Sequence, residues 1–236
     1  MALGQKNQQK QHYRFLSKVH RRPLKNKNPI GIFLDLTKAY DLLNHEVLFS
    51  KLNSYGIRDA SNLWFESYLS HWKKCVDINS MKQGLYVSTT GEIEHGVPQG
   101  SILGPIIFSL YISDPPLNIM GLKVVLFADD TNILVSEENI NKLQYKLNSV
   151  MNELQTLFTL NSFVVNVEKT LAVSFHTMQN KKPVSPHVIF EDSDISYNTE
   201  TKFLGICINE NMKWNNHIQY LSSKLNTSYN MIQGRI

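Results

Sequence analysis

Residues 123–135, KVVLFADDTNILV, place two acidic side chains between two runs of β-forming residues. The runs 123–127 and 131–135 are rich in branched and aromatic side chains, and only residues 128–130, Ala-Asp-Asp, separate them. Two such runs around so short a link are typical of a β-hairpin. Because neighbouring side chains on a strand point to opposite faces, only a turn lets both aspartates approach one site. The stretch therefore predicts an antiparallel hairpin with an acidic tip.

Another carboxylate, Asp35, ends the apolar run of residues 30–34, which predicts a buried strand. A carboxylate in that position costs free energy unless it is capped, paired or bound to a cation. If this strand lies beside the hairpin, Asp35 joins Asp129 and Asp130, and the three anions repel one another unless a divalent cation neutralises them. Carboxylate ligands with few other donors are typical of Mg²⁺, and two such ions can support phosphoryl transfer. The alternative is that Asp35 and Asp130 are ordinary turn or cap residues.

The remaining chain mixes predicted helices and strands without strict alternation, which favours an α+β fold. Asn44 and Gly56 are expected to cap and end one helix, and Asp59 to cap the next. Helices are expected over 44–55, after residue 59, and over 102–112, 140–160 and 216–231, and strands over 74–78, 85–88, 170–175, 189–190 and 203–208.

Composition limits the class of protein. The chain has 236 residues, of which 42% are apolar and 19% charged, as in a globular protein. Its two cysteines, Cys75 and Cys207, lie far apart, which fits a reducing, intracellular compartment. The longest apolar stretch, residues 102–112, is too short to span a bilayer, so we expect no membrane partner.

The charge is unevenly distributed. Eight basic and no acidic residues precede Asp35, whereas the rest carries 16 basic and 20 acidic residues. A basic arm of this kind is typical of a phosphate-binding element, because Lys and Arg displace the counterions of nucleic acid. The alternative is a solvated terminal segment without a binding role.

Five segments in order resemble the motifs of reverse transcriptases. FLDLTKAYD (33–41), GVPQGSILGP (96–105) and FADD (127–130) resemble the palm motifs, and NSFVVNVEKT (161–170) and FLGICIN (203–209) the two that follow. The second segment is most similar to the non-LTR, Jockey-like retrotransposons. The resemblance implies an α+β polymerase palm, with an antiparallel sheet against helices, partial fingers and a truncated thumb.

The resemblance also implies a metal site and its reaction. Asp35 and Asp129 match the metal-binding aspartates, Asp130 matches the third catalytic aspartate, and the backbone carbonyl of Leu36 is expected to face a metal. The ions are expected to be two Mg²⁺, with Mn²⁺ as a substitute. The expected partners are an RNA template, a DNA primer and dNTP substrates, and by family analogy alone the compartment is the nucleus.

Further positions match the nucleotide and primer sites of the family. Tyr40 matches the aromatic gate against a 2′-OH, Gln99 and Gly100 match the loop beside the incoming nucleotide, and Lys169 matches a candidate general acid. Residues 203–205, Phe203, Leu204 and Gly205, match the primer grip. The ordinary alternative for Tyr40 is a core aromatic at the start of a helix, and that for Gln99 and Gly100 is a Gly-Pro turn. For Lys169 it is a solvated surface lysine, and for residues 203–205 a core strand.

The expected organisation is a basic lead-in (1–29), a reverse transcriptase palm with residual fingers (30–210) and the start of a truncated thumb (211–236). Only 34 residues precede Asp35, and none matches the basic finger residues of the family. Ser162 also stands where a glycine is usual. A catalytically inactive nucleic-acid-binding remnant is therefore the alternative. An RNA-directed RNA polymerase or a maturase is a third hypothesis. Tyr40 and the sequence of residues 96–101, GVPQGS, disfavour it.

Overall fold

The computed structural model describes residues 28–70, 73–75, 77–80, 84–89, 91–92, 95–98, 100–112, 125–127, 130–177 and 185–233. The chain forms two compact units. Residues 1–36, 117–156 and 165–236 make up the sheet unit, and residues 37–116 and 157–164 make up the helical unit. The basic arm up to residue 27 lies outside the described residues.

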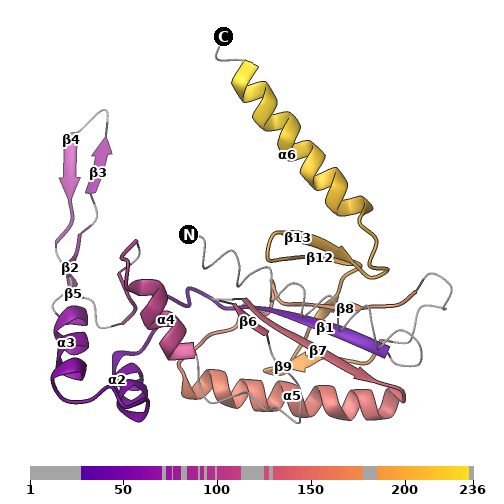
Figure 1. Cartoon of the computed structure of the whole chain (residues 1–236), viewed down its shortest axis with the longest axis horizontal. Helices are drawn as coiled ribbons and strands as arrows, with labels where there is room; N and C mark the ends of the chain where they lie inside the picture. Colours follow the sequence, from indigo (N-terminus) through magenta and orange to yellow (C-terminus); the bar gives the residue numbers. More distant parts are fainter. Residues whose placement is uncertain are drawn as a thin grey trace. The chain divides into compact units, whose positions relative to one another are not determined.

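The sheet unit is built on a five-stranded sheet in the order β11-β8-β1-β7-β6 (Figure 1). The central strand β1 (Asn28–Asp35) pairs antiparallel with β7 (Asp130–Glu137) and with β8 (Leu171–Ser174). At the edges, β6 (Val125–Phe127) is antiparallel to β7, and β11 (Ser196–Tyr197) is parallel to β8. The predicted strand at 30–34, the predicted hairpin at 123–135 and the α+β class are confirmed.

One face of this sheet carries the apolar positions Ile30, Ile32 and Ile133, all of which are buried. Figure 1 shows α5 (Ile140–Leu160) running along the sheet. Its residues 143, 147, 150 and 154 recur at helical spacing and are fully buried. This stripe explains why a sequence with many polar residues forms the long helix that was predicted over 140–160.

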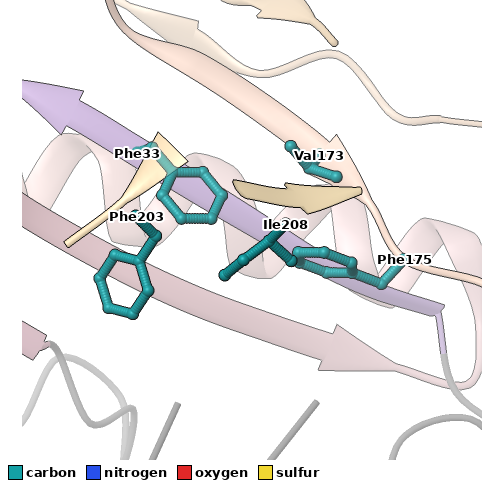
Figure 2. Packing of buried hydrophobic residues seen from close by; sticks show 5 residues of the cluster. All are labelled: Phe33, Val173, Phe175, Phe203 and Ile208. Carbon is teal, nitrogen blue, oxygen red and sulfur yellow. The ribbon is translucent and has the colours of Figure 1, made fainter. Parts of the chain in front are cut away.

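The other face carries Phe33, which lies in a buried cluster with Val173, Phe175, Phe203 and Ile208 (Figure 2). Phe203 and Ile208 belong to a hairpin of β12 (Glu200–Phe203) and β13 (Ile206–Asn209). The rings of Phe33 and Phe203 meet edge to face, with centroids 5.9 Å apart. Since alternate residues of β1 share a face, Asp35 lies on the side of the sheet that this hairpin covers.

The prediction of one strand over 203–208 is wrong, because a tight turn interrupts it. Leu204 and Gly205 both have positive φ, 46° and 86°, as the central residues of a type I′ turn require. A shorter hairpin joins β9 (Ile189–Phe190) to β10 (Ser193–Asp194). The helix predicted over 216–231 is α6 (Asn215–Gln233), which has no buried residue. No described helix is both long and apolar enough to cross a membrane.

The helical unit contains α2 (His45–Ser54), α3 (Ala60–Leu69) and α4 (Gly104–Ile112). The helices end largely where predicted, and Oδ1 of Asn44 accepts a hydrogen bond from the Val47 N–H at 3.1 Å. Asp59 precedes α3 as expected, but its side chain makes no capping hydrogen bond, so that prediction is wrong. The strand expected over 74–78 is divided between β2 (Lys73–Lys74), paired with β5 (Gly91–Glu92), and β3 (Asp77–Ser80), paired with β4 (Gly84–Val87).

Tyr111 is fully buried in the core of the helical unit. Its hydroxyl donates a hydrogen bond to the carbonyl of Asn161 at 2.7 Å, and its ring meets Phe163 edge to face at 5.4 Å. The ammonium of Lys51 donates to the carbonyl of Tyr111 and to Oδ1 of Asn161, and lies 4.5 Å from the centroid of the Tyr111 ring. These contacts tie α2 and α4 to residues 157–164.

Candidate functional site

Asp35 and Asp130 face each other at one end of the sheet. Asp35 is the last residue of β1 and Asp130 the first of β7, and the register pairs them directly. Directly opposite positions in an antiparallel pair share a face and lie about 5 Å apart between Cα atoms. The expectation that the strand of Asp35 lies beside the acidic hairpin is therefore confirmed. The structure describes Asp130 by its backbone alone, and Asp129 lies outside the described residues.

A single turn holds both backbone polar groups of Asp35. Its N–H donates to Oγ1 of Thr170 at 3.3 Å, and its carbonyl accepts from the Asn166 N–H at 2.8 Å. Oγ1 of Thr170 in turn donates to the carbonyl of Asn166 at 2.8 Å, and Thr170 is buried. The pairing of β1 with β8 ends at Phe33 and Leu171, so the Thr170 hydroxyl supplies the next acceptor along β1. The turn thus sets where Asp35 stands at the strand end.

The same turn carries Lys169 towards Asp35. Oδ1 of Asn166 accepts a hydrogen bond from the Lys169 N–H at 3.2 Å, which is an Asx-type turn. Nζ of Lys169 lies 3.9 Å from Oδ2 of Asp35, and the two side chains are 71% and 40% exposed. A pair this open to solvent is weakly held. The ammonium is therefore free to turn to a phosphate ligand beside Asp35.

Leu36 follows Asp35 and forms an isolated antiparallel bridge with Val165. The hydrogen bonds that flank this bridge run from Thr37 N–H to Val164 O and from Asn166 N–H to Asp35 O. Neither uses the carbonyl of Leu36, although the Leu36 side chain is buried. The role of this carbonyl as a metal ligand stays a prediction.

The donors at this end of the sheet fit a hard cation. A carboxylate at Asp35, a backbone carbonyl at Leu36 and an aspartate opposite at position 130 are all oxygen ligands of the kind Mg²⁺ binds. Among the described residues no group of three or more metal-ligating side chains occurs. Asp129, which the sequence predicts as a ligand, is not one of those residues.

In the helical unit, Gly96 brings the loop of residues 96–100 against the turn that holds Tyr40. The Gly96 N–H donates to Leu43 O at 2.7 Å, and the Val97 N–H donates to Tyr40 O at 3.0 Å. The carbonyl of Gly96 accepts from Nε2 of His45 at 2.7 Å. Gly96 has φ of 85°, and a Cβ there would lie 2.8 Å from the carbonyl oxygens of Tyr40 and Asp41. Glycine is therefore required at this position.

Tyr40 is half-buried, and its ring stacks on Phe108 of α4 at 4.2 Å with an interplanar angle of 21°. It lies in a turn and not at the start of a helix, which was the alternative. Gly100 is exposed with φ of 85°, and a Cβ added there would meet no atom of the described residues within 4 Å. Gln99 lies outside the described residues. The ring and the loop are thus held by the same unit.

The three positions predicted to form a primer grip lie partly in the core and partly at the turn of the β12–β13 hairpin. Phe203 is buried against Phe33, so its side chain serves the core of the sheet unit. Leu204 is half-buried and Gly205 exposed at the turn of the hairpin. Gly205 and the exposed part of Leu204, which also packs against the core cluster, are therefore open to solvent, whereas the ring of Phe203 is not.

Sequence reasoning did not find Asn166, Thr170 or His45, which position the predicted site residues. The sequence does contain a signal for Asn166, because asparagine is a turn-forming residue and stands three positions before Lys169. Thr170 gives no local signal, because its hydroxyl acts on Asp35, 135 residues away.

We expect Thr170→Val to lower the free energy of unfolding by about 2 kcal/mol, because it leaves the partly buried N–H of Asp35 without its acceptor at nearly unchanged side-chain volume. Thr170→Ser keeps the hydroxyl and loses a methyl group, and should cost about 1 kcal/mol. Urea denaturation of both variants provides the comparison. An equal loss in the two variants would mean that the hydroxyl has no such role.

The chain matches the family model described as reverse transcriptase (RNA-dependent DNA polymerase) over residues 4–208. This match covers most of the chain, and the chain belongs to the reverse transcriptase family.

Its relatives include polymerases of non-LTR retrotransposons, in agreement with the resemblance drawn from the sequence. It is 26% identical over 205 residues to the RNA-directed DNA polymerase from mobile element jockey of Drosophila melanogaster, covering 84% of this chain and 21% of the relative. It is also 26% identical over 202 residues to the probable RNA-directed DNA polymerase from transposon BS of the same species, covering 80% and 21%. The chain thus spans about a fifth of the length of these relatives.

The fold is similar to that of telomerase. An apo telomerase from Candida tropicalis, truncated from its C-terminal domain, superimposes with a TM-score of 0.53 at 16% identity, covering 86% of this chain and 38% of that one. Telomerase from the same species in complex with a fragment of telomeric RNA has the same TM-score at 15% identity, covering 86% and 32%. At this identity the likeness concerns the fold, and it agrees with the predicted polymerase palm.

Proposed function

We propose that this chain is the catalytic domain of a non-LTR retrotransposon polymerase, which adds dNTPs to the 3′-OH of a DNA primer on an RNA template. The observation that carries the proposal is the direct pairing of Asp35 with Asp130 at the sheet end. Family membership supports the reaction, and the position of the pair on the hairpin-covered face supports its use on a primer. Action in the nucleus follows the family analogy.

We propose that Asp35, Asp129, Asp130 and the carbonyl of Leu36 hold two Mg²⁺ ions, or Mn²⁺ in their place. When bound, such ions would favour ionisation of the primer 3′-OH and would neutralise charge on the triphosphate. The 3′-OH gives its proton to solvent water, and its oxygen forms a bond to the α-phosphorus as the bond to pyrophosphate breaks. Lys169, whose Nζ lies 3.9 Å from Oδ2 of Asp35, is placed to give a proton to the departing pyrophosphate.

The two units take different parts in this proposal. The sheet unit corresponds to the palm, with residues 211–236 as the start of a thumb, and the helical unit supplies residual fingers. Gln99 and Gly100 line the path of the nucleotide, and Leu204 and Gly205 hold the primer end. Residues 1–29 add basic charge for the nucleic acid backbone.

Tyr40 acts in this proposal as a steric gate against a ribose 2′-OH, with its ring held by Phe108. We expect Tyr40→Ala to raise ribonucleotide incorporation relative to deoxynucleotide incorporation by about tenfold, which corresponds to about 1.4 kcal/mol in the transition state. Tyr40→Phe keeps the ring and is the control. Competition between dNTPs and rNTPs in single-nucleotide extension measures the ratio. An active Tyr40→Ala enzyme with unchanged sugar preference would exclude the gate.

The experiment that tests the proposed function is primer extension by the purified chain on an RNA template with Mg²⁺ and dNTPs, beside Asp129→Ala. We expect extension by the wild type and none by the variant. A folded wild-type chain that binds primer–template but does not extend it would support the inactive, nucleic-acid-binding remnant instead.

A further inference from the structure

Two lysines of the sheet unit converge on one tyrosine ring. Nζ of Lys202, on β12, and Nζ of Lys224, on α6, each lie 5.0 Å from the centroid of the Tyr220 ring. Lys224 follows Tyr220 by one helical turn, whereas Lys202 comes from the hairpin that contacts the start of α6. Both lysines are exposed and Tyr220 is half-buried, so the ammonium groups meet at the surface.

This cluster concentrates positive charge. In the described part of the chain, neither lysine has a carboxylate within ion-pair distance. Glu200, the acidic residue nearest to Lys202 along β12, receives a hydrogen bond from the amide of Asn216. Hydrogen bonds from Lys202 and then Lys224 lower the pKa of Tyr220, and the bond to Tyr220 raises the pKa of Lys202. Lys202 therefore stays charged at neutral pH, and an anion between the two lysines would relieve their repulsion.

The surroundings indicate a nucleic acid strand as the source of that anion. The ring of Trp214, which directly precedes α6, is followed by the rings of His217 and Tyr220 on α6, with successive centroids 6.0 Å and 6.3 Å apart. Trp214 is 49% exposed. Exposed aromatic rings beside lysines are the usual surface for a strand, because the rings contact bases or sugars while the lysines contact phosphates. An acidic peptide would use the lysines but has no need of the rings.

We infer that Lys202, Tyr220 and Lys224 form a binding site for one backbone phosphate of a nucleic acid strand. Lys202 directly precedes Phe203, Leu204 and Gly205, so the site adjoins the hairpin tip and extends that surface onto α6. The ring of Tyr220 holds the two positively charged ammonium groups of Lys202 and Lys224 close to each other. This inference rests on the proposed function, because it assumes that the chain binds a primer–template.

The test measures the affinity of the purified chain for a fluorescent RNA–DNA primer–template at several salt concentrations. We expect the double variant Lys202→Gln/Lys224→Gln to bind about tenfold more weakly at 0.1 M salt, and its slope of log K against log salt to be smaller by about 1, as for one lost phosphate contact. The matched control is Lys73→Gln/Lys142→Gln, which removes two exposed lysines elsewhere. We expect the control to keep its slope; an equal change in both double variants would overturn the inference.

Tyr220→Leu tests the site without changing the formal charge of any lysine. We expect about a threefold loss of affinity, because the two ammonium groups are no longer held at one ring. Unchanged affinity would exclude the part given to Tyr220.

A second experiment tests whether the ligand is a nucleic acid strand or a free phosphate compound. Calorimetric titration with inorganic pyrophosphate should give the same affinity for the wild type and the Lys202→Gln/Lys224→Gln variant. A variant that loses pyrophosphate but keeps the primer–template would overturn the assignment to a strand.

These readouts are independent of catalysis. A chain that extends no primer, but whose salt slope falls in the double variant, would contradict the proposed reaction and support the phosphate site. A chain that extends primers, with an unchanged slope in the variant, would contradict the phosphate site alone.

Discussion

Replacement of Asp35 by Asn is expected to lower the rate of primer extension by about 10³-fold while the chain remains folded. The amide keeps the size of the side chain but loses the negative charge that holds a divalent cation. Because the Asp35 side chain is 40% exposed and its backbone is held by Asn166 and Thr170, the substitution changes charge without disturbing packing. The loss should therefore be one of catalysis and not of stability.

Single-turnover extension with Mg²⁺ measures this loss, and the increase in melting temperature on adding Mn²⁺ gives a readout without catalysis. We expect that increase to disappear in Asp35→Asn. Glu168→Gln is the matched control, because it removes an exposed carboxylate from the turn that holds Asp35. An Asp35→Asn chain that keeps more than about a tenth of the wild-type rate would show that Asp35 does not hold the metal.

Gly96→Ala is expected to lower the free energy of unfolding by about 3 kcal/mol or more. Its φ of 85° lies in the left-handed region, which costs an alanine about 1–2 kcal/mol. The new Cβ would also lie 2.8 Å from the carbonyl oxygens of Tyr40 and Asp41, which are backbone atoms and cannot rotate away. The loop must then move, and the hydrogen bonds that join Gly96 and Val97 to the turn of Tyr40 weaken.

Gly100→Ala separates these two costs. Gly100 has the same φ of 85°, but within the described part of the chain no atom lies within 4 Å of the position of its Cβ, so only the backbone strain of about 1–2 kcal/mol applies. Urea denaturation of the two variants, with the same chain as reference, measures the difference. Equal losses would show that the contact with Tyr40 and Asp41 does not constrain the loop.

The elements that the sequence predicts well are those with a strong local pattern. Residues 30–34 are a continuous apolar run and residues 140–160 repeat apolar residues at helical spacing, and both elements form as predicted. The prediction of a single strand over 203–208 was wrong because Leu204 adopts a positive φ. A positive φ is uncommon for leucine, so the sequence does not indicate a turn at this position. Asp59 is of a type that caps helices, but its own φ of 52° differs from the extended conformation of a capping residue.

By itself, the sequence determined the α+β class, the ordered motifs of a reverse transcriptase and the choice of Asp35 as a site residue, because each depends on residue types close together in the chain. Only the tertiary structure decided that Thr170 and Asn166 hold the backbone of Asp35, and that Lys202 and Lys224 meet at Tyr220. Such contacts depend on strand register and on how a hairpin and a helix pack. These are properties of the whole fold, which bring together residues that have no pattern in common along the chain.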